Sequence, residues 1–363
     1  MPDVNYKNEL AKRNFFRWLK EAKGLCDASV NCYEKAILLY EDFSDHSDFS
    51  RFSSDKAIEF KKWLLRKKNK GKTISVSTYH TYLRYLKVFF SWLCMQDDYK
   101  NKISLDSVSY LNASEKDVRI ATHYVPRKYP TLEDVFKVVT NIKIESEIDL
   151  RDRAMISFTL LSGMRDKAII TLPIGCFDVE NLIINQNPKR GVQTKFSKYI
   201  SSVLFRFDER LVEYVLEWVK HLKEKNFGLN DPLFPKNKTN KGNDNLSYVK
   251  SDSIEPEYWK EAGQIRQIFK KRFKDAHLPY YPPHTFRHLA IDLSFKLCKN
   301  GEELKAVSQN FGHDNIATTF RSYANYGPQK LAEILTKMNF SEKQTDLASS
   351  KLEQIKEIIN NVV

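Results

Sequence analysis

Four segments in the second half of the chain carry side chains that could do chemistry together. They are SGMRDKA with Arg165, QTKFSK with Lys195, HTFRH with His284 and Arg287, and FGHDNIATTFRSYANY with His313 and Tyr323. On a helix, His284 and Arg287 are one turn apart, so an imidazole and a guanidinium can face one ligand. A forked, always protonated guanidinium suits an oxyanion. Each group alone also has an ordinary structural explanation, so only the combination indicates a site.

A metal site is the first alternative for the same residues. His284 and His288 stand at i and i+4, but the metalloprotease pattern needs Glu directly after the first histidine, where this chain has Thr285. Arg287 between the two rings would also repel a cation. We therefore expect no metal and no other cofactor, and we interpret His288 as a packed helix residue. The sequence has no G-x-x-x-x-G-K-[ST] phosphate loop, so we expect no use of ATP.

Composition indicates a polyanionic partner. The 363 residues include 59 Lys plus Arg against 46 Asp plus Glu, a formal charge of +13, which favours nucleic acid first and an acidic membrane surface second. Hydrophobic residues make up 42%, which excludes a wholly disordered chain. Five cysteines without a C-x-x-C pair are typical of a reducing compartment. With no signal-peptide core and no membrane-length apolar run, we expect a soluble, cytoplasmic, nucleoid-associated protein without a membrane partner.

The elements that must position these groups form two domains. The first hundred residues read as helices, one capped by Ser53 or Ser54 and running toward Gly71, another following Ser77. The second helix carries an apolar stripe that we interpret as core: Tyr79, Tyr82, Leu83, Leu86, Phe90 and Leu93. Periodicity fades between about 97 and 130. We expect a helical domain at 1–110, a linker at 111–129, a second domain at 130–340 and a helical tail at 341–363.

The second domain mixes helices with two short strands. Thr131 and Asp134 form a capping pair, and an apolar helix at 150–161 ends at Gly163. Residues 181–185 and 198–205 alternate as strands, and further helices follow. The predicted fold class is mostly α with a small antiparallel β-sheet (α+β).

In order and composition, the four segments resemble the tyrosine recombinase (phage integrase) family, which breaks and rejoins DNA. STYHTYLRYLKVFFSWL resembles the family's helical core-binding domain, and Pro130 to about Met338 resembles its catalytic domain. The resemblance implies the family fold and a site-specific recombinase that needs neither metal nor ATP. Its implied partners are duplex DNA recombination sites, further copies of the chain in a synaptic tetramer, and accessory DNA-bending proteins.

The resemblance also implies roles for the catalytic residues. Arg165 and Arg287 would bind the non-bridging oxygens of the scissile phosphate, with hydrogen bonds from His284 and His313. Tyr323 would attack phosphorus to form a 3′-phosphotyrosine, with His284 taking the phenolic proton. Lys195 would protonate the departing 5′-oxygen.

This chain departs from the family pattern in three places. Tyr323 stands ten positions after His313, one more than in many members, so Tyr326 is a rival nucleophile. Ala168 stands where many members have Glu, and Asp166 and Lys167 are candidates to support Arg165 instead. Three lysines lie between the predicted strands, so Lys189 and Lys198 remain alternatives to Lys195.

Basic runs outside these segments are candidates for phosphate contacts, with a solvated basic face as the alternative. Residues 61–72 hold seven basic residues and no acid. The predicted DNA-binding residues are Lys61, Lys62, Arg66, Lys67, Lys68, Arg84, Lys87, Lys270, Lys271 and Arg272.

The tail has an apolar face that we expect to dock on a neighbouring protomer. Two rival functions remain: relaxation without synapsis, like a type IB topoisomerase, and a non-catalytic basic DNA-binding regulator.

Overall fold

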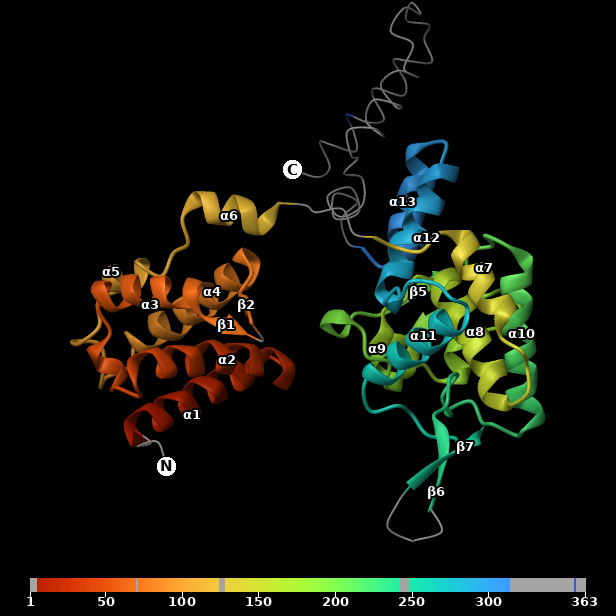
Figure 1. Cartoon of the computed structure of the whole chain (residues 1–363), viewed down its shortest axis with the longest axis horizontal. Helices are drawn as coiled ribbons and strands as arrows, with labels where there is room; N and C mark the ends of the chain where they lie inside the picture. The colour runs from red at the N-terminus through yellow and green to blue at the C-terminus, as the bar shows by residue number, and fades with distance from the viewer. Residues whose placement is uncertain (1–4, 70, 124–127, 242–247, 314–355, 357–363) are drawn as a thin grey trace, which may run out of the picture. The chain divides into compact units, whose positions relative to one another are not determined.

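The computed structural model describes residues 5–69, 71–123, 128–241, 248–313 and residue 356. The chain divides into two compact units, residues 1–124 and 125–363, and Figure 1 shows the elements of each. Within the described ranges, no helix has the length and apolar character that crossing a membrane requires.

The first unit is built from helices around an aromatic core. Its helices are α1 (Tyr6–Glu21), α2 (Asp27–Ser44), α3 (Ser54–Arg66), α4 (Val76–Leu93), α5 (Leu105–Ser109) and α6 (Glu115–Thr122). Ser53 caps α3 through the backbone N–H of Lys56, as its sequence predicts. The apolar stripe of α4 is buried except for the half-buried Tyr82, and Phe90 stacks on Phe52 with ring centroids 3.9 Å apart. The interpretation of the stripe as core is confirmed.

Two local features of this unit differ from the prediction. The helix expected to run toward Gly71 ends at Arg66 and is followed by the hairpin β1 (Lys68–Asn69) and β2 (Lys72–Thr73). Gly71 reverses the chain with a φ of +80°, which disfavours other residues. In the range 111–129, predicted as a linker, α6 forms behind the cap Ser114. This helix is only eight residues long, and none of its residues is buried.

The second unit surrounds the central helix α8 with further helices and a small sheet (Figure 1). Its helices are α7 (Leu132–Asn141), α8 (Glu147–Ser162), α9 (Asp166–Ile170), α10 (Glu209–Glu224), α11 (Gly263–Asp275), α12 (Pro283–Leu297) and α13 (Gly301–Asn310). Thr131 and Asp134 form the predicted capping box of α7. Most of α8 is buried, because α7, α10 and α12 all pack on it.

The sheet is antiparallel with the order β3 (Phe177–Asp178), β4 (Ile183–Gln186) and β5 (Ile200–Val203), so β5 is an edge strand. Ile184 pairs with Ser202 in the β4–β5 register. The predicted fold class, mostly α with a small antiparallel sheet, is confirmed. The ribbon β6 (Asn237–Lys241) and β7 (Tyr248–Ile254) was not predicted, because residues 237–241 are polar throughout and show no apolar alternation.

A buried ion cluster joins α8 to α11 and corrects one prediction. Both Nε and Nη2 of Arg272 donate to Asp152, and Nη2 also donates to Asp149 at 2.7 Å. Arg151 donates to the other oxygen of Asp152, and Arg272 is only 6% exposed. The expectation that Arg272 contacts DNA is wrong, because its charge is buried and neutralised inside the unit. Its neighbours Lys270 and Lys271 are exposed on the same helix.

Acid should destabilise the second unit through Asp149. Burial alone would raise the pKa of this carboxyl, but hydrogen bonds from Ser146 and Arg272 outweigh it, and the pKa is lowered. A lowered folded pKa gives stability that is present above the unfolded value of about 3.9 and is lost as the pH falls through the folded value. Urea unfolding from pH 7 to pH 3 should show this loss. Asp149→Asn should be less stable at pH 7 and fall less steeply below pH 4; parallel curves would contradict the assignment.

Candidate active site

The turn before Arg165 is fixed by a glycine and by a distant arginine. Helix α8 ends at Gly163, whose φ is +57°, and a Cβ at this position would lie 2.3 Å from the ring of Phe311. Arg287 donates from Nη1 to the Gly163 carbonyl at 2.8 Å. Only glycine fits both the backbone angle and the close approach. The predicted helix end at Gly163 is therefore also a packing contact.

Arg287 joins three separate segments of the chain. It lies on α12, is 3% exposed, and donates from Nη2 to the Phe311 carbonyl at 2.7 Å. The same nitrogen is 2.8 Å from Nε2 of His313. Because an arginine only donates, Nε2 of His313 accepts and the ring proton lies on Nδ1. Residues 163–165, 284–287 and 311–313 are thus brought together by one guanidinium.

The C-terminal end of α13 sets the position of His313. The backbone N–H of Gly312 donates to Gln309, that of His313 donates to Ser308, and Gly312 has a φ of +70°. This paired bonding around a left-handed glycine is the Schellman motif, which sets the direction in which the chain leaves a helix. The conformation of Gly312 therefore fixes the position of His313 relative to the end of α13.

His284 lies in the first turn of α12, directly after Pro283, and is half-buried. Its ring meets that of His288 edge-on with centroids 5.3 Å apart. His288 is 8% exposed and stacks on Tyr129, which agrees with its interpretation as a packed helix residue. Among the described residues there is no group of three or more His, Cys, Asp or Glu side chains that could hold a metal ion.

Arg165 precedes α9 and is half-buried. Within the described part of the chain, its guanidinium makes no hydrogen bond or ion pair, in contrast to Arg287. The next residue, Asp166, accepts from Nε of Arg266 at 3.0 Å. Since Arg266 already pairs with Asp166, this carboxylate anchors α11 beside the Arg165 turn.

The three candidate lysines lie in the connection between β4 and β5. Lys195 is exposed and lies over the ring of Phe196, with Nζ 4.8 Å from its centroid. Lys198 donates to the Gly312 carbonyl at 3.3 Å. Lys189 is exposed in a 3₁₀ turn (Pro188–Arg190). Lys198 also lines a pocket of about 290 Å³ that His313 shares, so in this structure it is the lysine brought to the imidazole.

Phe196 and Ser197 give this lysine turn an unusual backbone. Both have positive φ, 59° and 50°, and Phe196 is 88% exposed. A bulky residue in the left-handed region costs free energy that burial does not recover here. The sequence revealed neither the backbone strain at Phe196 and Ser197 nor the register of the β4–β5 hairpin.

The predicted nucleophile lies outside the described residues. Tyr323, its rival Tyr326 and the predicted tail all fall within 314–363, of which the structure describes only residue 356. The roles given to the two tyrosines therefore stay predictions.

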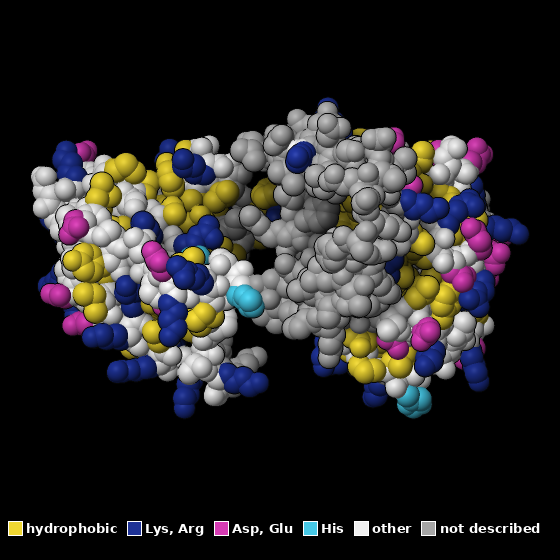
Figure 2. All heavy atoms as spheres, turned by 90° about the horizontal axis from the view of Figure 1, so that it is seen from above, with side chains coloured by type: hydrophobic (Ala, Val, Ile, Leu, Met, Phe, Trp, Pro, Cys, Tyr) yellow, Lys and Arg dark blue, Asp and Glu magenta, His cyan; other side chains and the backbone are white. Residues whose placement is uncertain are grey.

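The predicted DNA-binding lysines of the first unit lie in different settings. Lys61 donates to the backbone carbonyl of Asn112 and Lys87 to its side-chain oxygen, at 3.1 and 2.7 Å. Burial lowers the pKa of Lys61, and nearby Asp117 opposes this. Lys67 pairs with Asp42 at 2.9 Å. The remaining predicted residues of this unit are exposed: Lys62, Arg66, Lys68 and Arg84. Figure 2 shows Lys and Arg side chains over much of the visible surface.

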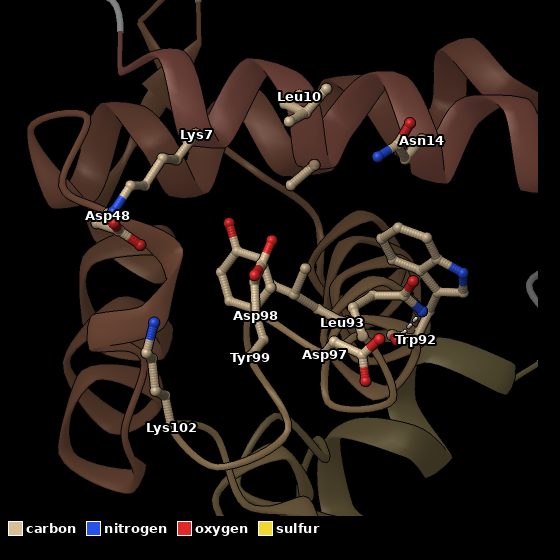
Figure 3. A pocket seen from close by; sticks show the side chains of 12 residues that line it. Lys7, Leu10, Asn14, Asp48, Trp92, Leu93, Asp97, Asp98, Tyr99 and Lys102 are labelled. Carbon is tan, nitrogen blue, oxygen red and sulfur yellow. Dashed lines mark hydrogen bonds between the residues drawn. The ribbon is translucent and has the colours of Figure 1, made fainter.

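The first unit also contains a separate pocket of about 370 Å³ (Figure 3). Asp48 and Asp98 line it together with Lys7 and Lys102, beside the ring of Tyr99. Because both signs of charge are present, the lining indicates no particular class of ligand.

Comparison with known proteins gives the class of the molecule. Residues 131–330 match the phage integrase family. Tyrosine recombinase XerD of Oceanobacillus iheyensis is 22% identical over 324 residues, covering 86% of this chain and 92% of that protein. Tyrosine recombinase XerD of Haemophilus influenzae is 24% identical over 325 residues, covering 87% and 93%.

Two solved structures share the fold. A lambda integrase (75–356) dimer bound to a COC′ core site has a TM-score of 0.59 at 12% identity, covering 93% of this chain and 99% of that one. The XerH recombinase in a post-cleavage complex with its difH substrate has a TM-score of 0.58 at 20% identity, covering 90% and 84%. The fold and the relatives together define an enzyme of the tyrosine recombinase class. Because the family match spans more than half of the chain, the protein belongs to the phage integrase family, as its motifs predict.

Proposed function

We propose that this protein cuts and rejoins duplex DNA at specific sites through a covalent 3′-phosphotyrosine, without metal or ATP. Arg165 and Arg287 bind the non-bridging oxygens of the scissile phosphate, and His284 and His313 add hydrogen bonds. Tyr323 attacks phosphorus and gives its proton to His284, while a lysine of the β4–β5 turn protonates the leaving 5′-oxygen. The energy of the ester is kept in the covalent link, so rejoining reverses the same steps.

The single observation that carries this proposal is the set of hydrogen bonds made by Arg287. They link the carbonyl two residues before Arg165 to the segment that ends in His313. A segment 124 positions before Arg287 and a segment about 25 positions after it therefore meet at one buried cation, as a phosphate site without a metal requires. A regulator that only binds DNA has no need of this convergence.

Recombination joins two duplexes, so we propose that the chain acts as several copies on DNA. The related lambda integrase is seen as a dimer on its core site and XerH is seen on its difH substrate, which supports DNA-bound assembly here. A synaptic tetramer, bending proteins and docking of the tail at 341–363 extend this proposal. A relaxation assay on supercoiled DNA lacking a paired site separates it from topoisomerase-like activity.

Covalent trapping tests the nucleophile. A site selected from random duplexes is nicked beside the cleavage position, so that the short strand diffuses away and the adduct persists. We expect a protein–DNA adduct with wild type and Tyr326→Phe, in EDTA and without ATP, and none with Tyr323→Phe. An adduct that maps to Tyr326 would show that the motif alignment is displaced.

The same assay distinguishes the lysines. The second substrate has sulfur in place of the bridging 5′-oxygen. Its leaving group departs as a thiolate and needs no proton, because a thiol has a pKa of about 8.5. We expect Lys195→Met to slow cleavage of the ordinary substrate about 10²-fold and to cleave the sulfur substrate at close to the wild-type rate. Lys198→Met should show no such difference between substrates. If the rescue belongs to Lys198→Met instead, Lys198 is the proton donor.

A further inference from the structure

Asn310, the last residue of α13, binds the free edge of β5. Its side-chain oxygen accepts from the backbone N–H of Val203 at 2.6 Å, and its side-chain nitrogen donates to the carbonyl of the same residue at 2.9 Å. Leu204 donates to Leu182 on the other side, so Val203 points its N–H and carbonyl away from β4. The amide thus takes the place that one residue of a further strand would have.

Two more contacts continue along the same edge. A Cβ at Gly312 would lie 2.7 Å from Cδ1 of Ile200, so the backbone of Gly312 lies directly against the first residue of β5. Lys198, two residues earlier, donates to the Gly312 carbonyl. Residues 310–312 therefore run beside residues 198–203, with the two bonds of Asn310 at one end of the junction.

This junction connects two parts of the proposed site. His313 follows the α13 end directly, and β5 begins directly after the turn that carries Lys195 and Lys198. We propose that Asn310 is a positioning residue that holds the lysine turn at a fixed place relative to His313, so that a lysine reaches the leaving 5′-oxygen. This inference rests on the proposed function and adds a residue to it.

The exposure of Val203 and Asn310 favours a positioning role for Asn310 over a role in stabilising the fold. Val203 is 48% exposed and Asn310 is half-buried, so water would satisfy both backbone groups if the side chain were shortened. The net stabilisation from such hydrogen bonds is small. Two bonds to a single residue do, however, fix both the distance and the register of the strand edge, which general-acid chemistry needs.

The chemical step defines the readout. Tyr323 forms an O–P bond while the P–O5′ bond breaks, the phenolic proton passes to His284, and a lysine ammonium gives its proton to O5′. With a bridging 5′-sulfur the P–S bond breaks and the thiolate leaves without a proton. A defect in lysine placement therefore affects the oxygen substrate alone, whereas a loss of folding or of DNA binding affects both.

The experiment compares Asn310→Ala with wild type on both substrates in single-turnover adduct formation. We expect cleavage of the oxygen substrate to be about 10- to 100-fold slower, cleavage of the sulfur substrate to stay within about 3-fold, and DNA affinity to stay within about 2-fold. Asn300→Ala is the matched control, because Asn300 caps the opposite end of α13 through Glu303 and does not reach β5.

Three outcomes would overturn the inference. Asn310→Ala could slow both substrates equally, as a structural role predicts, or cleave the oxygen substrate at the wild-type rate. The Asn300→Ala control could show the same selective defect, which would assign it to general loosening of α13. Failure of the proposed function is distinguishable from all three, since wild type itself would then form no adduct on either substrate.

Discussion

Replacing Arg287 with lysine should reduce both the rate of adduct formation and the stability of the second unit. Loss of one preorganised donor to a developing oxyanion typically costs about 10²–10³ in rate, and a lysine keeps the charge but not the fork. The carbonyls of Gly163 and Phe311 also lose their partner, which should cost about 1–3 kcal/mol of unfolding free energy. Single-turnover cleavage of the nicked duplex and urea unfolding measure the two effects.

Arg165→Lys is the matched variant that separates these effects. The Arg165 guanidinium makes no hydrogen bond within the described residues, so its loss should change the unfolding free energy by less than about 0.5 kcal/mol. The rate of adduct formation should fall by about 10²–10³, as for Arg287→Lys. If Arg287→Lys cleaves at the wild-type rate, or if Arg165→Lys does, the phosphate is not held by that residue and the proposed mechanism is wrong.

Asp152→Asn should cause the largest loss of stability. Asp152 is 2% exposed and accepts from both Arg151 and Arg272, so the substitution leaves Arg151 without its carboxylate and Arg272 with Asp149 alone. Removing one partner of a buried ion pair costs about 3–5 kcal/mol, because the charge left behind, here that of Arg151, is desolvated without its carboxylate. Asn has nearly the same volume as Asp, so no cavity contributes. Urea unfolding followed by tryptophan fluorescence gives the change in unfolding free energy.

Glu217→Gln provides the comparison at the surface. Glu217 accepts from Arg153 at 2.6 Å, but its side chain is 52% exposed, so water screens the pair. The expected loss is about 0–1 kcal/mol. Equal effects of the two substitutions would mean that the Asp152 cluster is solvated in solution and that burial does not set its energy.

Local signals predicted a large part of the fold. The caps at Ser53 and Thr131, the stripe of α4 and the stop at Gly163 were all visible, because each depends on residues within one or two helical turns. The ribbon β6–β7 was missed, since residues 237–241 are polar and lack the periodicity on which such predictions depend, and helix α6 was missed because it is only eight residues long.

The predicted DNA-binding role of Arg272 was wrong for a physical reason. Arg272 stands in the sequence among exposed lysines, yet its side chain turns inward to two carboxylates that lie more than a hundred residues earlier. Which face of α11 is buried depends on how it packs against α7 and α12. A run of charges in the sequence carries no information about such a distant partner.

The sequence by itself determined the chemical groups and their order: two arginines, two histidines, a choice of lysines and a tyrosine, with glycines before Arg165 and His313. Charge, nucleophilicity and backbone freedom are properties of single residues, so they can be read directly from the sequence. Only the tertiary structure decided that Arg287 binds the carbonyls of Gly163 and Phe311 and that β5 lies along the end of α13. Such contacts join residues from 24 to 124 positions apart, and their distances follow from how buried helices pack.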